Sequence, residues 1–176
     1  MGGNSPLSAA RTVLVDANVF FAIGRPPNSK YVRFRREIQS AGVVLKLPRR
    51  VVGELGGPET ERIRTAVSEG WAEIIDPPAP TDAAAMRASD IARWTIADET
   101  GQPEHEVEKT DTILAGLAIQ YVRDSATTDV TVLTDDKPAA KAITNAISAQ
   151  GYTDAITVYG VSDIIGDESG DSMRLI

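Results

Sequence analysis

Short apolar runs that alternate with longer, helix-patterned segments constrain the fold of this chain more than any other feature. The runs are Thr12–Val15, Val43–Leu47, Trp71–Ile75, Asp129–Thr134 and Ala155–Val158. A run without alternating polar residues is typical of a strand that is covered on both faces, as in a parallel sheet. Strands that alternate with helices build such a sheet between two helical layers. The sequence therefore predicts an α/β fold, a three-layer α/β/α sandwich with a central parallel sheet.

The segments between these runs carry residues that begin and end helices. Helices are predicted over Ala17–Ile23, Ser29–Ser40, Arg49–Leu55, Glu59–Glu69, Asp82–Thr100 and Ala139–Gln150, with one more that carries Asp111. Gly70 ends the fourth of them, Pro138 suits the first turn of the last, and Gly151 caps its end. These boundaries support the alternation of strand and helix.

Length and composition favour one cytoplasmic domain. The chain has 176 residues, one domain's worth, and no cysteine, which excludes disulfides, zinc ribbons and thiol nucleophiles. No apolar run approaches the roughly 20 residues that span a bilayer, and the amino terminus lacks the pattern of a secretory signal. We therefore predict a flexible leader over 1–10, a single domain over 11–165 and an acidic, disordered tail over 166–176, without membrane association.

The net charge of −7 argues against a general nucleic-acid coat protein, which would be basic. It is compatible with an enzyme that holds RNA through metal ions and a local basic patch, and it also suits a high-salt cytoplasm. The candidate phosphate contacts are Arg33, Arg35 and Arg36, with Arg49 and Arg50 as a second group. The alternative for these residues is a solvated helix face that balances the acidic remainder. Phe20 and Phe21 are predicted to be core residues and not stacking platforms for bases.

Acidic residues follow two of the predicted strands directly. Asp16 follows Thr12–Val15, and Asp135 and Asp136 follow the strand that ends at Thr134. In an open parallel sheet, ligands bind at the carboxyl edge near the switch point in strand order. If these two strands are neighbours, their carboxylates share that edge. The alternative is that each Asp serves only as a turn or helix N-cap residue.

Two more acidic positions add to this pattern. Asp111 heads an apolar stripe at helical spacing, formed by Leu114, Ala115, Ala118, Ile119 and Val122. A charge aimed toward a core is costly unless it is paired or bound to a metal. Glu54 has Val51 and Leu55 beside it, so it is expected at the border of a buried face, with an ordinary surface position as the alternative.

Converging carboxylates repel one another, and a hard divalent cation such as Mg²⁺ or Mn²⁺ removes that repulsion. A water on such an ion becomes more acidic and attacks a phosphodiester while the ion offsets developing charge. The sequence offers no other catalytic group, because His105 is the only histidine and is expected to be solvent-exposed. No phosphate-binding glycine motif is present either. The pattern therefore indicates a metal-dependent nuclease.

The chain resembles the PIN-domain family of metal-dependent ribonucleases. The resemblance lies in four blocks that occur in the family's order between residues 11 and 160: Val13–Val19, Val51–Leu55, Asp111–Ala118 and Val132–Lys137. It implies a PIN-like fold and an endoribonuclease that uses Mg²⁺ or Mn²⁺. By resemblance, Asp16, Asp111 and Asp136 hold the metal directly or through water, and Glu54 orients or activates the attacking water.

The same resemblance makes Asn18 and Thr134 hydrogen-bonding supports. The chain departs from the family at Asp135, where Asn or a variable residue is more usual, so the fourth carboxylate is Asp135 or Asp136, and we prefer Asp136. The segment Asp76–Gln102 is long for a minimal member and is expected to add helices over one side.

Many members of the family are toxins of toxin–antitoxin pairs, often dimeric, and others trim RNA precursors. The resemblance thus implies an RNA substrate and is consistent with a homodimer and an antitoxin protein as partners. One alternative function is a haloacid-dehalogenase-like phosphatase, although its motif needs a second Asp where this chain has Asn18. The other is a PIN-like module that binds RNA or protein without cutting.

Overall fold

The apolar runs form one parallel sheet in a computed structural model that describes residues 6–7, 12–77, 80–107, 109–125 and 129–166. For residues 109–111 and 125 it describes the backbone alone. The strands are β1 (Thr12–Val15), β2 (Leu45–Pro48), β3 (Ala72–Ile75), β4 (Val130–Leu133) and β5 (Ile156–Tyr159). The five strands are ordered β3-β2-β1-β4-β5, and every neighbouring pair is parallel. The predicted parallel sheet is confirmed.

The predicted helices are present with boundaries that differ by a few residues at most. They are α1 (Ala17–Ile23), α2 (Ser29–Ala41), α3 (Arg49–Glu54), α4 (Glu61–Ser68), α5 (Ala83–Thr100), α6 (Lys109–Ser125) and α7 (Lys137–Ala149). Two short elements were not predicted as separate helices, the 3-10 turn η1 (Glu104–Glu106) and α8 (Val161–Ile165). The second strand also begins later than predicted, and Val44 before it is 42% exposed.

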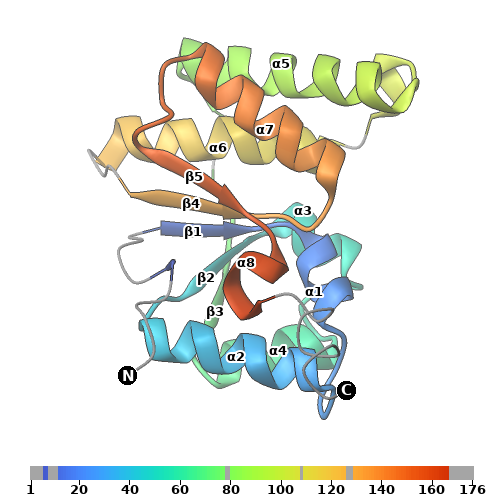
Figure 1. Cartoon of the computed structure of the whole chain (residues 1–176), viewed down its shortest axis with the longest axis vertical. Coiled ribbons are helices and arrows are strands. Elements are labelled where there is room, and N and C mark those ends of the chain that lie inside the picture. The colour runs from blue at the N-terminus through green and yellow to red at the C-terminus, as the bar shows by residue number, and fades with distance from the viewer. Residues whose placement is uncertain (1–5, 8–11, 78–79, 108, 126–128, 167–176) are drawn as a thin grey trace, which may run out of the picture.

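Helices cover both faces of the sheet, which gives the three layers predicted (Figure 1). Residues of β1 alternate between two cores, because successive side chains of a strand point to opposite faces. Val13 and Val15 pack in the core beneath α1, α2 and α8, whereas Leu14 packs in the core beneath α6 and α7. Burial on both sides explains why this strand reads as an uninterrupted apolar run.

An aromatic cluster joins the first helices to the sheet. The ring of Trp71, just before β3, lies 6.2 Å from Phe20 of α1 in a stacked arrangement. Its edge contacts with Tyr31 and Phe34 of α2 have centroid distances of 5.9 and 6.4 Å. All four rings are buried. Because α1 begins directly after β1, this packing holds the residues that follow the first strand.

The long segment predicted to add helices over one side forms the single helix α5, which lies outside α6 and α7 (Figure 1). Small residues allow α5 to approach α6 closely. A Cβ added at Gly116 of α6 would lie 2.4 Å from the Ser89 hydroxyl and 2.9 Å from the carbonyl oxygen of Ala85. Such distances leave no room for a side chain at this position.

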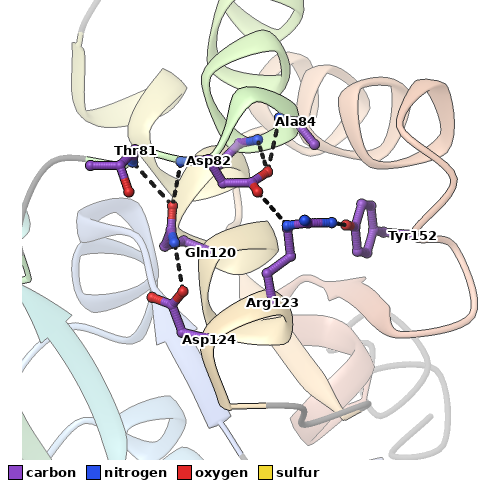
Figure 2. Close-up of polar contacts among 8 residues, drawn as sticks. Thr81, Asp82, Ala84, Gln120, Arg123, Asp124 and Tyr152 are labelled. Atoms are coloured by element: carbon purple, nitrogen blue, oxygen red, sulfur yellow. Dashed lines mark hydrogen bonds and ion pairs between the residues drawn. The ribbon is translucent and has the colours of Figure 1, made fainter.

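Polar contacts fix the start of α5 (Figure 2). The Asp82 carboxylate accepts hydrogen bonds from the Ala84 and Ala85 amides at 2.9 and 3.3 Å, and it pairs with Arg123 of α6. Arg123 also donates to the Tyr152 hydroxyl at 2.9 Å. The side-chain oxygen of Gln120 accepts from the backbone amide of Asp82 at 3.2 Å. The outer helix is therefore anchored to its neighbours at its first turn.

Only a small part of the predicted leader and tail lies within the described residues. Leu7, within the predicted leader, is described and is fully buried in the core. The rest of 1–10 except residue 6 lies outside the described residues, as does 167–176 of the predicted tail. Among the helices that the structure describes, none combines the length and apolar character that a membrane span requires.

Candidate active site at the carboxyl edge of the sheet

The order of strands reverses between β1 and β4, and the acidic residues lie at that point. The chain passes outward from β1 to β2 and β3, then returns to place β4 on the other side of β1. Val15 pairs with Leu133, and the Asp16 amide donates to the Leu133 carbonyl oxygen at 2.9 Å. Asp16 and Thr134 therefore leave the sheet side by side, at the switch point where open parallel sheets bind ligands.

The Asp16 carboxylate is buried and held by three hydrogen bonds. The residue is 1% exposed. Its Oδ1 atom accepts from the Ala17 amide at 2.8 Å, which caps α1. Its Oδ2 atom accepts from the Asn18 side-chain amide at 2.9 Å and from the Thr134 hydroxyl at 3.0 Å. A carboxylate has about four acceptor positions, so these bonds leave one, on Oδ1.

Asn18 and Thr134 link the two strand ends through hydrogen bonds. The Asn18 amide nitrogen donates to Asp16 and, at 3.2 Å, to the Thr134 hydroxyl oxygen. Its oxygen accepts from the Asp135 backbone amide at 2.6 Å. The nitrogen of this amide thus meets acceptors and its oxygen meets a donor, so the hydrogen bonds define the orientation of the Asn18 side chain.

Burial raises the pKa of Asp16 above the ordinary carboxyl value of 3.8, because a desolvated charge is costly. Hydrogen bonds from Thr134, Ala17 and Asn18 lower the pKa, and the negative charge of Glu54 raises it further. Glu54 is the last residue of α3 and is exposed. The structure thus brings Glu54 within electrostatic range of Asp16, although the two residues are 38 positions apart in the sequence.

The two aspartates after β4 have different environments. Asp135 is exposed, and its Oδ1 accepts from the Val161 amide at 3.1 Å at the start of α8. Asp136 is half-buried, and its Oδ1 accepts from the Ala139 amide at 3.2 Å as the N-cap of α7. The Asp136 amide also donates to the Thr134 hydroxyl oxygen at 3.4 Å. Asp135 therefore contacts α8, while Asp136 is hydrogen-bonded to the Thr134 hydroxyl, which also donates to Asp16.

The acidic residue of the third predicted block, Asp111, is described in its backbone only. Asp111 lies in the first turn of α6, as predicted, and its side chain lies outside the described residues. Among the side chains that the structure does describe, no three acidic or histidine residues form a cluster that could hold a metal ion. The predicted metal roles of Asp16, Asp111, Asp135 and Asp136 therefore stay predictions.

The predicted RNA-contacting arginines lie in different surroundings. Arg33 donates to the Ile165 carbonyl oxygen of α8. Arg35 lies over the Tyr31 ring and pairs at 3.5 Å with Glu69, which precedes β3 and thus lies toward the opposite edge of the sheet from Asp16. Arg36 of α2 is exposed. Arg49 pairs with Asp76 at 3.2 Å.

Arg50 has a different place from these four arginines. It lines a cleft of about 550 Å³ together with Arg93 and His105. His105 is exposed, as predicted. Arg93 was not singled out from the sequence, because a basic residue on a long helix does not indicate which element it lies against.

The prediction that Phe20 is core is confirmed, whereas the same prediction for Phe21 is wrong: Phe21 is 55% exposed, with Arg62 over its ring.

The fold and this arrangement agree with a comparison against family models. Residues 9–173 match the model of the halobacterial PIN domain. The chain belongs to this PIN-domain family. PIN domains are generally nucleases and typically use divalent metal ions. A search of curated proteins finds no match to the chain.

Proposed function

We propose that this PIN domain is a metal-dependent endoribonuclease that hydrolyses phosphodiester bonds of RNA with Asp16, Glu54, Asp111 and Asp136. The observation that carries the proposal is the buried Asp16 carboxylate at the switch point, with a second carboxylate, Glu54, acting on it. A purely structural helix cap does not need a buried negative charge beside another one, because Ser or Asn caps a helix equally well. A site that receives a cation does need it.

The donor set fits Mg²⁺ or Mn²⁺. These ions prefer oxygen ligands, and Mg²⁺ typically takes one or two carboxylates and keeps several waters. Asp16 has one free acceptor position on Oδ1, and the Oδ2 atom of Asp136 accepts no hydrogen bond from the described residues. Asp16, Asp111 and Asp136 would hold the ion, with Asp135 as a further oxygen donor. When bound, the ion would make a coordinated water more acidic and offset charge on the phosphate.

The protein's own groups would position the reaction. Asn18 and Thr134 keep the Asp16 carboxylate oriented and favour its ionised form, because both donate to Oδ2. The exposed Glu54 carboxylate would orient the attacking water and accept its proton. The phosphodiester would be held by basic groups around the edge of the sheet, since the acidic centre itself repels it.

The hydrogen bonds of Asn18 weigh against a haloacid-dehalogenase-like phosphatase. A phosphatase of that class needs a second carboxylate at this position, whereas Asn18 donates to Asp16 and accepts from Asp135. An antitoxin partner, a homodimer, and a toxin-like or RNA-processing role stay predictions from the family resemblance. So does the alternative of a module that binds without cutting.

The proposal is tested by incubating labelled single-stranded and hairpin RNA with the protein, with Mn²⁺ or with a chelator. The variant Asp16→Asn removes the buried charge, and Asp154→Asn is its control, because Asp154 is exposed and precedes β5 at the opposite edge of the sheet. We expect Mn²⁺-dependent cleavage by the wild type and Asp154→Asn. Asp16→Asn should lose more than the roughly 10- to 100-fold typical of residues that only support a metal ligand. Equal cleavage by all three proteins would contradict the proposal.

A further inference from the structure

A cleft of about 550 Å³ opens between α3, η1, α5 and α6. Its volume lies within the roughly 300–1,000 Å³ of pockets that hold small molecules. Its lining combines cationic, polar and apolar groups. None of the predicted roles of the acidic residues accounts for it.

The cleft lies beside the candidate carboxylates. Arg50 in its wall is four residues before Glu54 on α3, so the two side chains lie on one face of that helix. Thr112 in the opposite wall follows Asp111 at the start of α6. Both α3 and this end of α6 lie at the end of the sheet where α1 begins (Figure 1). A polymer bound at the candidate active site can therefore extend into the cleft.

The charges in the cleft favour an anion. Among the lining residues that the structure describes there are two arginines, Arg50 and Arg93, and one carboxylate, Glu104, so this described part of the lining is positive in a protein of net charge −7. Arg93 pairs with Asp90 at 3.4 Å, but side chains that are 42% and 71% exposed make a weak pair. Within the described part of the chain, Arg50 has no ion pair, in contrast to its neighbour Arg49, which binds Asp76.

Apolar side chains line the same cleft. Val107 is 7% exposed, and Ile113 of α6 is half-buried beside it. Such a surface suits the face of a nucleobase, and the guanidinium groups suit a phosphate. The wall formed by α5 is held in place before a ligand arrives, because the Asp82 network and the close packing at Gly116 anchor this helix (Figure 2). Binding would therefore need little ordering of the protein.

We propose that this cleft binds one nucleotide of a single-stranded RNA substrate, adjacent to the bond that is cut. Arg50 and Arg93 contact its phosphate, and Val107 and Ile113 lie against its base. This inference rests on the proposed ribonuclease function and assigns to it a subsite for the strand. It requires an unpaired strand, because a base in a duplex cannot present its face to the cleft.

The test measures RNA binding without cleavage. A fluorescent single-stranded RNA of about ten nucleotides is titrated with the protein in the presence of a chelator, and anisotropy gives the dissociation constant at several salt concentrations. The test variant is Arg50→Gln/Arg93→Gln. Its control, Arg64→Gln/Arg87→Gln, makes the same change of charge at exposed residues of α4 and α5 that do not line the cleft.

We expect the test variant to bind at least about tenfold more weakly than the control, since each substitution removes one charge-assisted contact to the RNA. The dependence of log affinity on log salt should also fall by about 1.4, the value for two phosphate contacts with a single strand. Equal weakening by both double variants would overturn the subsite, as would no weakening by either. Competition by free mononucleotides as strong as that by the oligonucleotide would also overturn it, in favour of a free nucleotide as ligand.

The two proposals fail in different ways. If the wild type cleaves RNA with Mn²⁺ and the cleft variant binds RNA as tightly as its control, the ribonuclease function stands and the subsite is wrong. If the wild type binds RNA through the cleft but cleaves none with either metal, the catalytic proposal is wrong.

Discussion

Replacing Thr134 by valine tests the assignment of the hydroxyl as the support of Asp16. The two side chains have nearly the same shape, and Thr134 is 2% exposed, so the substitution removes one polar atom without opening a cavity. The hydroxyl donates to Asp16 Oδ2 at 3.0 Å and accepts from the Asn18 amide at 3.2 Å. In the variant Asn18 keeps its hydrogen bond to Asp16. The main interaction lost is therefore the hydrogen bond from the hydroxyl to Asp16 Oδ2.

The size of the effect follows from the charge of the acceptor. A hydrogen bond to a charged group contributes roughly 1.5–3 kcal/mol, and we expect Thr134→Val to lower the free energy of unfolding by about this amount at neutral pH. In a domain of this size that corresponds to a melting temperature lower by roughly 3–12 °C. The control is Thr131→Val, because Thr131 is also buried in β4, and the described residues give its side chain no hydrogen bond. It should change stability by less than about 0.5 kcal/mol.

The dependence on pH separates this account from one of packing alone. Burial raises the pKa of folded Asp16 above 3.8, and the Thr134 hydrogen bond opposes that rise. A raised carboxyl pKa makes the folded state bind more protons than the unfolded chain, so stability falls as pH rises from 3.8 toward the folded pKa. Removing the hydroxyl raises the pKa of folded Asp16 further, so stability continues to fall up to a higher pH. The variant should therefore lose less stability near pH 4 than near pH 7.

Urea unfolding of both variants and the wild type, at about pH 4 and about pH 7 with a chelator present, measures these differences. Thr131→Val should show no difference between the two pH values. A loss at Thr134→Val that is the same at both would mean that the hydroxyl does not stabilise an ionised Asp16. The interpretation of the site as a buried carboxylate in need of support would then be wrong.

Three further outcomes are expected. Mn²⁺ or Mg²⁺ should raise the melting temperature of the wild type and not of Asp16→Asn, since a ligand stabilises only the state that binds it; equal shifts in calorimetry would count against metal binding at Asp16. Gly116→Ala should lose about 1–3 kcal/mol in urea unfolding, because its Cβ would lie 2.4 Å from the Ser89 hydroxyl, whereas Gly53→Ala meets no atom within 4 Å and should lose nothing. With a net charge of −7, the protein should unfold at higher temperature in about 2 M KCl than in about 0.1 M KCl, because salt screens the repulsion among carboxylates; greatest stability in dilute buffer would refute this.

The sheet and the switch point could be predicted because their physics is local or follows from a general rule. The apolar run of β1 requires cover on both faces, and an Asp after such a strand must lie at its carboxyl edge. The prediction that Asp16 shares an edge with Asp135 and Asp136 needed only that their strands be neighbours, which the pairing of Val15 with Leu133 provides. The Asn18 bridge was accessible only through the family resemblance, since an Asn two residues after a strand has many ordinary roles.

Features that depend on contacts between distant segments could not be predicted from the sequence. The helix α8 has five residues, too few for a periodic pattern, and its start is held by Asp135 from another strand end. Without that contact, Asp135 and Asp136 could not be told apart. The exposure of Phe21 was missed for a similar reason, because Arg62, which lies over its ring, comes from α4.

Net charge proves a poor guide to what this surface binds. Arg62 donates to the Phe20 carbonyl oxygen at 3.1 Å; burial lowers the pKa of Arg62, and the nearby positive charge of Arg25 lowers it further. These two arginines line a hollow of about 160 Å³ together with one carboxylate, Glu61, and with Leu55, the residue after Glu54. The α3 segment with Glu54 thus has arginines beside it in this hollow as well as in the larger cleft. If the proposed site is correct, we expect an acidic centre with arginines on two sides to attract phosphates to its rim and a metal ion to its middle. The average charge of −7 conceals both properties.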